Sequence, residues 1–477
     1  MRVWNPEAAT QPAHSPLFVR YHFFFILLFT TIATAVAFSP TPEGLTIQGQ
    51  RAIGIFTLCV SFWVTAVIPL QITSIIAIIM LPMLGIMDSD QAFALFGNKA
   101  VFFILGAFII SAVIVDSGLS SRATYFVLSR FAFSARALRT AIIIFAAFSS
   151  CWMSEHAVAA MLFPIVMSIV KALGLKPFQD RFGMSFFFAM AWGCVIGGIT
   201  TYLGGARNLL AVGILHEQTG VTISFVDWAK ASTPLVGVLL TFALAFLHFG
   251  YPATDVNMKA VSESLKHKSD SLGPFTRREK GVAIVTLVTI FCWVVFHDIV
   301  GLATMALASV AMLFILRLTE WDTVEQSVNW GVILMYGGAI ALGSALSSTG
   351  AAEWVVDKTF GAADLSSFTL IVMLGAMSLI LTEFISNAAV VSVLMPVALG
   401  LAHTRGISPQ LMAFTIALPS GLSYVLPMGT PATAIAYSSG YMTQKDFMSA
   451  GPVMAMVSLI TFALVAKYYW PLIGYSM

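Results

Sequence analysis

A short polar stretch inside a long apolar run carries the side chains best suited to chemistry. It reads Ser149-Ser150-Cys151-Trp152-Met153-Ser154-Glu155-His156. Its hydroxyls and carboxylate are oxygen ligands of the kind that hard cations prefer, and its carboxylate and imidazole can carry protons. In hydrocarbon such groups are tolerated only where protein or water lines a cavity. The stretch therefore predicts a functional site.

The composition around this stretch indicates a polytopic helical membrane protein. Of the 477 residues, 58% are hydrophobic and 10% are charged, whereas soluble domains carry about 25% charged residues. The apolar run from Arg139 to Lys171 covers 33 residues, which is too long for one crossing of a core of ~30 Å at ~1.5 Å per residue. Because both flanks are basic, both are expected on the cytosolic side. Residues 139–171 are therefore predicted to form a re-entrant hairpin with the polar stretch at its tip.

The remaining apolar runs predict an all-α fold with about 11 transmembrane helices and two re-entrant hairpins. Residues 1–20 are predicted to be a cytosolic segment, and 21–51 to hold the first span. Further spans are expected at 52–69, 72–86, 100–116, 231–249, 281–298, 302–317, 330–348 and 451–471. Two runs with internal breaks, 184–216 and 410–440, predict broken helices. The basic segment 250–280 is expected to be a cytosolic linker.

The second half of the chain repeats the first. Adding 232 to Gly118, Ser154 or Pro164 gives Gly350, Ser386 or Pro396. A constant offset over this length indicates an internal repeat. Repeat 1 is assigned to residues 52–249 and repeat 2 to residues 281–471, with a second polar-centred hairpin at 366–402.

The charges of one repeated segment differ between the two copies. Residues 118–139 carry four arginines and no acid, which predicts an amphipathic helix on the cytosolic surface. The equivalent segment 350–364 carries Glu353, Asp357 and Asp364 against Lys358, so it is expected outside. The two repeats are therefore predicted to be inverted, as in many secondary transporters.

With these features the chain resembles the divalent anion/sodium symporters, the family of dicarboxylate, citrate and sulfate carriers. In that family each hairpin tip reads Ser-Asn-Thr, and a broken helix lies beside each tip. The tips here read Ser154-Glu155-His156 and Ser386-Asn387-Ala388. The breaks read Gly204-Gly205-Ala206-Arg207-Asn208 and Pro427-Met428-Gly429-Thr430-Pro431-Ala432-Thr433. The resemblance implies a homodimer, an elevator-type movement, two sodium sites, and an anion bound between the tips.

The resemblance also implies binding residues, position by position. The implied sodium ligands are Ser150, Ser154, Glu155, Gly204 and Gly205 in repeat 1, and Thr382, Ser386, Asn387 and Gly429 in repeat 2. The implied substrate contacts are Ser154, Glu155, His156, Arg207, Asn208, Ser386, Asn387, Ala388, Thr430 and Pro431. The chain departs from the family pattern at Glu155, where asparagine is expected, and at His156 and Ala388, where threonine is expected.

Three charged residues leave the coupling chemistry open. A carboxylate at Glu155 would repel a dianion unless Na⁺, a proton or Arg207 offsets its charge. Arg207 lies in the glycine-rich break, where it is expected either to contact the anion or to pair with Glu155, and we favour the pair. Glu383 follows Thr382 in the second hairpin and is interpreted as a counter-charge or a proton carrier.

The sequence therefore predicts a secondary active transporter in the bacterial inner (cell) membrane. The expected cargo is a divalent organic anion of the C4-dicarboxylate type, with Na⁺ as the coupling ion and no other cofactor. Two alternatives stay open, namely sulfate or another inorganic anion, and proton-linked or exchange transport in which Glu155 and Arg207 replace one sodium. Proton coupling would make H⁺ the partner ion.

Other classes fit the residues less well. An intramembrane enzyme using Glu155 and His156 would need a nucleophile or a second metal ligand, and the second repeat has Asn387-Ala388 there instead. A cation/proton antiporter is disfavoured by Arg207. No basic stretch with interleaved aromatic residues indicates a nucleic-acid partner, so the lipid bilayer and small ions are the expected partners.

Overall fold

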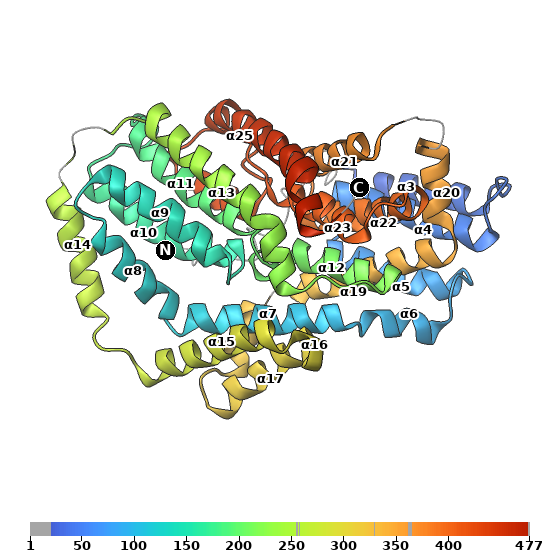
Figure 1. The fold of residues 1–477 in the computed structure, drawn as a ribbon, viewed down its shortest axis with the longest axis horizontal. Helices are drawn as coiled ribbons and strands as arrows, with labels where there is room; N and C mark the ends of the chain where they lie inside the picture. The colour runs from blue at the N-terminus through green and yellow to red at the C-terminus, as the bar shows by residue number, and fades with distance from the viewer. Residues whose placement is uncertain (1–20, 254–255, 257, 329, 361–364, 476–477) are drawn as a thin grey trace.

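The structure is a computed structural model that describes residues 21–253, 256, 258–328, 330–360 and 365–475. Within these residues every regular element is a helix (Figure 1). The predicted cytosolic segment 1–20 and Asp364 lie outside the described residues.

The first half of the chain forms helices separated by short connections. Their bounds are α3 His22–Phe38, α4 Ile47–Thr65, α5 Leu70–Met83, α6 Ser89–Phe96, α7 Lys99–Asp116, α8 Leu119–Arg130, α9 Ala135–Ser150, α10 Glu155–Ala172, α11 Arg181–Gly197, η1 Tyr202–Gly204, α12 Ala206–Thr219 and α13 Phe225–Gly250.

The second half begins with α14 and ends in short turns. Its bounds are α14 Met258–Ser271, α15 Arg277–Val295, α16 His297–Val300, α17 Leu302–Ile315, α18 Trp321–Ser327, α19 Trp330–Ser348, α20 Ala351–Phe360, α21 Ser367–Leu381, α22 Asn387–Arg405, α23 Pro409–Ala417, η2 Pro419–Gly421, α24 Pro431–Tyr437, α25 Gln444–Leu464, η3 Val465–Tyr469 and η4 Pro471–Ile473.

The helix bounds follow the sequence repeat as far as the hairpins. The bounds of α5 plus 232 are those of α17, and the starts of α8, α9 and α10 plus 232 are the starts of α20, α21 and α22. Beyond the hairpins the offset shortens, because α11 begins at Arg181 and α23 at Pro409. The loops that break the two helices therefore have no constant spacing.

Six helices among the described residues are long and apolar enough to cross a bilayer alone. They are Ser89–Asp116, which joins α6 and α7, Glu155–Ala172, Phe225–Gly250, Trp330–Ser348, Asn387–Arg405 and Gln444–Tyr469. Shorter apolar helices are His22–Phe38, Leu70–Met83, Arg181–Gly197, Leu302–Ile315 and Ser367–Leu381. The chain is thus an all-helical membrane protein, while the count of about 11 spans, the re-entrant course of the hairpins and the inversion stay predictions.

Two predicted boundaries differ from the structure around the first hairpin. The surface helix predicted at 118–139 ends at Arg130, and the hairpin begins at Ala135. Arg139 is buried within α9, where it donates to Ser185 Oγ at 2.9 Å and to the Tyr251 carbonyl at 2.7 Å. These acceptors lie far along the chain, so the sequence around Arg139 does not reveal them. Arg139 was therefore predicted to flank the hairpin at the membrane surface, although it lies in the protein interior.

The linker predicted at 250–280 also has internal structure. Helix α14 packs on α8 and buries Val261 and Leu265. The apolar residues lie four apart, so they share one face of the helix. This basic segment therefore contains a helix that packs against the first half of the chain, and it is not an open loop.

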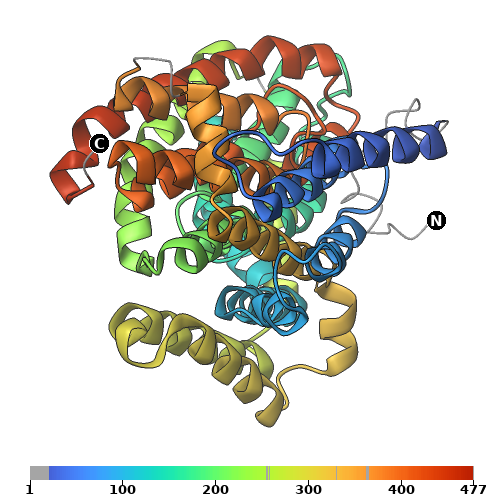
Figure 2. The ribbon, with the colours of Figure 1, turned by 90° about the vertical axis from the view of Figure 1, so that its right-hand side faces the viewer.

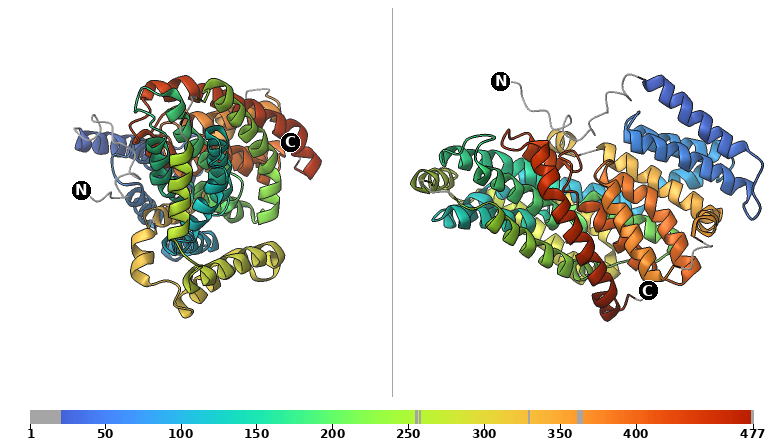
Figure 3. Two further views of the ribbon diagram at one scale, coloured as in Figure 1. Left: turned by 90° about the vertical axis from the view of Figure 1, so that its left-hand side faces the viewer. Right: turned by 90° about the horizontal axis from the view of Figure 1, so that it is seen from above.

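The two hairpins, α9–α10 and α21–α22, lie toward opposite ends of the molecule (Figure 1). Helices α15 and α17 pack on α7 and form a layer along one side (Figure 2). Helix α25 runs between the end with α9–α11 and the end with α21–α23 (Figure 3).

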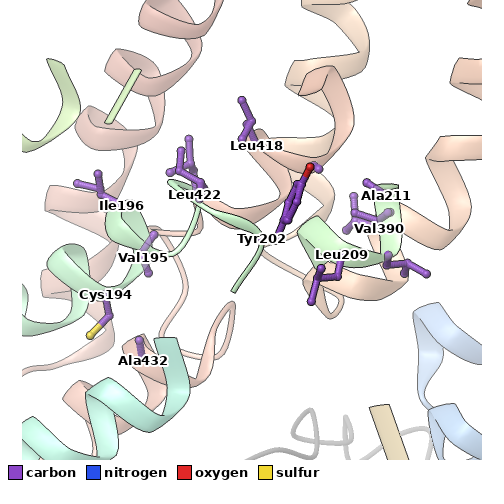
Figure 4. Packing of buried hydrophobic residues seen from close by; sticks show 14 of the residues in the cluster. Cys194, Val195, Ile196, Tyr202, Leu209, Ala211, Val390, Leu418, Leu422 and Ala432 are labelled. Carbon is purple, nitrogen blue, oxygen red and sulfur yellow. The ribbon is translucent and has the colours of Figure 1, made fainter. Parts of the chain in front are cut away.

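The helices that follow the two breaks cross from one repeat to the other. Helix α12 of repeat 1 packs on α22, the second arm of the other hairpin. Helix α24 of repeat 2 packs on α10, the second arm of the first hairpin. The apolar residues around these breaks include Tyr202, Leu209, Val390 and Leu418 (Figure 4). Each hairpin tip is therefore brought next to the other repeat's broken helix.

Candidate functional site

The two hairpin tips are built alike by a serine that begins the second helix. Ser154 Oγ accepts from the Ala157 amide at 3.3 Å, and Ser386 Oγ accepts from the Ala389 amide at 3.2 Å. A serine at this position satisfies a backbone donor that the first turn of a helix leaves unpaired. The hydroxyls of Ser154 and Ser386, expected as ligands, thus serve as helix caps, and α10 and α22 direct their N-termini at the tips.

Glu155, the first residue of α10, forms a buried ion pair with Arg207 of α12. The Arg207 guanidinium donates to Glu155 Oε1 at 3.0 Å and to Oε2 at 3.3 Å. The side chains are 1% and 2% exposed, respectively, so water hardly screens their attraction. Of the two alternatives that the sequence left open for Arg207, contact with Glu155 is the one observed.

Glycines at both breaks make room for this pair. A Cβ atom on Gly198 would lie 2.7 Å from Glu155 Oε2. A Cβ atom on Gly205 would lie 2.7 Å from an Arg207 nitrogen, and one on Gly421 would overlap with the guanidinium. Since Gly421 belongs to repeat 2, the guanidinium lies where the two broken helices meet.

The Asn387 amide lies between the ion pair and a group of oxygen atoms. One of its terminal atoms is 2.8 Å from Thr382 Oγ1 and 3.3 Å from the Gly429 carbonyl oxygen. The other is 3.1 Å from Arg207 and 3.4 Å from Glu155 Oε1. With its oxygen toward Arg207, the amide accepts from the guanidinium and donates to Thr382 and Gly429, which satisfies both ends.

The opposite orientation of this amide creates a site suited to a cation. Its oxygen then joins Thr382 Oγ1, the Gly429 carbonyl and the Ser420 carbonyl, which lies 2.6 Å from Thr382 Oγ1. Several neutral oxygens close together are ligands of the kind that a hard cation such as Na⁺ prefers. Thr382, Asn387 and Gly429 were all expected as sodium ligands of repeat 2, and the structure brings them together.

The equivalent region of repeat 1 is arranged differently. A Cβ atom on Gly204 would overlap with the Ser150 carbonyl, so the break packs tightly on the first hairpin. The Asn208 amide donates to the carbonyls of Gly198 at 2.9 Å and Thr201 at 2.7 Å. Asn208, expected as a substrate contact, thus holds the break loop. Gly204 thus lies against Ser150, and Gly205 lies against Arg207, whose guanidinium binds the Glu155 carboxylate.

The other expected substrate contacts lie at helix N-termini. His156 is the second residue of α10, and its Nδ1 is buried without a hydrogen-bond partner. Ala388 is the second residue of α22. Thr430 caps α24, and Pro431 is its first residue. Since Asn387 contacts Glu155, Arg207 and Gly429, the N-termini of α10, α12, α22 and α24 meet at one place. Helix N-termini carry partial positive charge and attract anions.

Glu383, interpreted from the sequence as a counter-charge or a proton carrier, accepts hydrogen bonds from the loop that breaks the second helix. The residue is 5% exposed, and its carboxylate accepts from Ser423 Oγ at 2.9 Å. It also accepts from the amides of Tyr424 at 2.8 Å, Val425 at 3.0 Å and Leu426 at 2.9 Å. Its position beside Thr382 indicated from the sequence that the carboxylate lies near the expected sodium site. The sequence did not indicate its partners, which lie about forty residues further along the chain.

Comparison with known proteins identifies similar chains. A family model described as the sodium:sulfate symporter transmembrane region matches residues 21–476. The sodium-dependent dicarboxylate transporter SdcS of Staphylococcus saprophyticus is 26% identical over 458 residues, covering 90% of this chain and 88% of that protein. The protein of the same name from Staphylococcus aureus strain USA300 is also 26% identical, covering 91% of this chain and 88% of its own.

Two solved structures share the fold at lower sequence identity. MtrF of Neisseria gonorrhoeae, described among antimetabolite efflux pumps, superposes with a TM-score of 0.58 at 12% identity and covers 97% of both chains. The YdaH transporter of Alcanivorax borkumensis has a TM-score of 0.58 at 14% identity, covering 96% of this chain and 99% of its own. These likenesses support the fold alone.

Proposed function

Because the chain belongs to the sodium:sulfate symporter family, which its sequence matches over residues 21–476, we propose that it carries a divalent organic anion of the C4-dicarboxylate type. Movement of the anion is coupled to sodium. The chain is an integral membrane transporter and not an enzyme. Its similarity to SdcS supports the dicarboxylate as cargo, since those relatives are sodium-dependent dicarboxylate transporters.

The meeting of four helix N-termini is the observation that carries this proposal. The N-termini of α10, α12, α22 and α24 converge around Asn387 and Arg207. Two helix ends from each repeat supply positive potential from two sides, which suits an anion with a carboxylate at each end. The proposal includes the homodimer and the elevator-type movement that the family resemblance implies.

The two repeats are proposed to treat the coupling cation differently. In repeat 2 the oxygens of Thr382, Asn387 and Gly429 form the exchangeable sodium site. In repeat 1 the Arg207 guanidinium lies against Glu155 and takes the place of a sodium ion permanently. The carrier would then use fewer sodium ions in each cycle than a relative with two neutral sites, or act as an exchanger.

Uptake into proteoliposomes tests the proposal. Purified protein is reconstituted, and entry of labelled succinate and labelled sulfate is followed with a sodium gradient, a pH gradient, both or neither. Succinate uptake driven by an inward sodium gradient is the expected result. Transport of sulfate in preference to succinate would overturn the cargo, and uptake that follows only the pH gradient would overturn sodium coupling. Counterflow of succinate without either gradient would identify exchange.

A further inference from the structure

We propose that Glu383 is the buried counter-charge of the coupling cation in repeat 2 and sets the affinity of that site for sodium. This inference rests on the proposed function, since it concerns the site formed by Thr382, Asn387 and Gly429. Glu383 is not a ligand in the structure. It is a positioning residue that acts through the loop 423–429 and through its charge.

The hydrogen bonds of Glu383 satisfy both carboxylate oxygens with donors only. Oε1 receives the amides of Tyr424 and Val425, and Oε2 receives the Ser423 hydroxyl and the Leu426 amide. Three of these four partners are backbone amides, which can only donate, so three of the four hydrogen bonds require an accepting carboxylate oxygen. Successive backbone amides form a concave site for an anion. The geometry therefore suits the ionised side chain.

This buried charge has no ionic partner of its own. The ion pairs in the described part of the chain involve Arg122, Arg207, Lys230 and Arg278, and none includes Glu383. An isolated charge in a buried environment is costly unless another charge compensates it. A place for such a charge is the oxygen cluster beside Thr382, the residue that directly precedes Glu383.

Glu383 lies close enough to that cluster to act on a cation there. A Cβ atom on Gly429 would be 3.1 Å from Glu383 Oε2 and would overlap with Ser423 Oγ. The Gly429 carbonyl faces the Asn387 amide at 3.3 Å. The loop that supplies this oxygen thus packs directly against the Glu383 carboxylate. A side chain at position 429 would collide with Ser423, so a glycine is needed there.

Comparison of the repeats indicates what the Glu383 charge does. The 232-residue offset relates Glu155 to Asn387 and Cys151 to Glu383. Each repeat therefore carries one buried carboxylate at its hairpin tip. In the repeat alignment the repeat 2 carboxylate lies four positions before the repeat 1 carboxylate. The repeat 1 carboxylate is neutralised by the fixed cation Arg207. In repeat 2 the carboxylate is left for an exchangeable cation, so the second tip is neutral only when that cation is bound.

Sodium binding to variants of the purified protein tests this inference. The midpoint of sodium-dependent thermal stabilisation is measured for the wild type, Glu383→Gln, Glu383→Asp and Ser423→Ala, and the sodium dependence of uptake is measured in parallel. Ser423→Ala is the matched control, because it removes one hydrogen bond to the carboxylate and keeps the charge. Loss of the charge in Glu383→Gln is expected to raise the sodium midpoint at least ~10-fold, whereas Ser423→Ala is expected to raise it less than ~3-fold.

The outcomes separate the inference from the proposed function. If the wild type shows neither stabilisation nor uptake that depends on sodium, the proposed function fails. If the wild type responds and Asn387→Ala does not, but Glu383→Gln keeps the wild-type midpoint, the site stands and the counter-charge is wrong. Equal shifts in Glu383→Gln and Ser423→Ala would reduce Glu383 to a loop-shaping role and overturn the inference.

A second pair of variants guards against misfolding. Should Glu383→Gln fail to give monodisperse protein, Glu383→Asp decides, because it keeps the charge while shortening the side chain. A midpoint within ~3-fold of the wild type supports the counter-charge, and a loss as complete as in Asn387→Ala contradicts it. Where Glu383→Gln folds, adding Asn387→Asp should restore part of the sodium affinity, since it returns a carboxylate to the same site.

Discussion

At the scale of single residues, Glu155 and Arg207 form an ion pair at the first hairpin tip. Both partners are buried, and among the residues that the structure describes neither forms a second ion pair. Removing one member of a buried pair typically costs about 3–5 kcal/mol, because it leaves an uncompensated charge, whereas removing both is milder. Glu155→Gln and Arg207→Gln are therefore each expected to abolish most succinate uptake, and the double variant to recover part of it.

The measurement is uptake by all three variants over a sodium titration. If the fractional activity of the double variant equals the product of the fractional activities of the two single variants, the residues act independently. If the sodium midpoint moves in Glu155→Gln alone, Glu155 is itself a sodium ligand and Arg207 belongs to the anion. Ser423→Ala is a suitable reference for expression and reconstitution, since it leaves this pair unchanged.

At the scale of helices, the close contact between α9 and α11 fixes the first hairpin. A Cβ atom on Gly193 would lie 2.6 Å from the Ile143 carbonyl, and one on Gly197 would overlap with the Ala147 backbone. Small residues four positions apart let two helix backbones approach in a membrane. The α11 end near the break is thereby held against the first hairpin.

Gly197→Ala is therefore expected to destabilise the protein by about 1–3 kcal/mol, since the added methyl group must push the helices apart. The matched control is Gly237→Ala in α13, where nothing lies within 4 Å of the added atom. There alanine is expected to be neutral or stabilising by up to ~1 kcal/mol, because it favours the helix. Thermal unfolding in detergent measures both. Equal effects would contradict the tight contact between the helices.

The sequence predicted the helices well and the contacts between them incompletely. The helix pairs α9–α10 and α21–α22 begin and end within about four residues of the predicted segments 139–171 and 366–402, because apolar length and glycine breaks are local signals. Arg139 was misplaced, since its acceptors Ser185 and Tyr251 come from other elements. The contact between Asn387 and Arg207 also depends on the crossing of α12 to the other repeat, which no local pattern encodes.

The site shows the same division at closer range. Contact between Glu155 and Arg207 was anticipated because a hairpin tip and a break were expected to be neighbours. The partners of Glu383 were not anticipated, because its donors are backbone amides of residues 424–426. Any residue type supplies such an amide, so only the folded loop reveals this interaction.

At the scale of the whole molecule, the inversion of the two repeats is the prediction on which the site's symmetry depends. Helices α8 and α20 begin 232 residues apart and occupy equivalent places in the repeats. Helix α8 carries Arg122 and Arg130 without an acid, while α20 carries Glu353 and Asp357 against Lys358. Since positive charge is retained on the cytosolic side, the two helices should lie on opposite faces of the membrane.

Cysteine labelling in intact cells tests this directly. Ala123 on α8 and Asp357 on α20 are both exposed, whereas Ser120 is buried and would label poorly. In a background without the four natural cysteines, a membrane-impermeant maleimide should label Asp357→Cys in intact cells and Ala123→Cys only after permeabilisation. Labelling of both from one side would make the repeats parallel. The two hairpins would then reach the site from the same side of the membrane, and an anion bound between their tips could not be exposed to each side in turn.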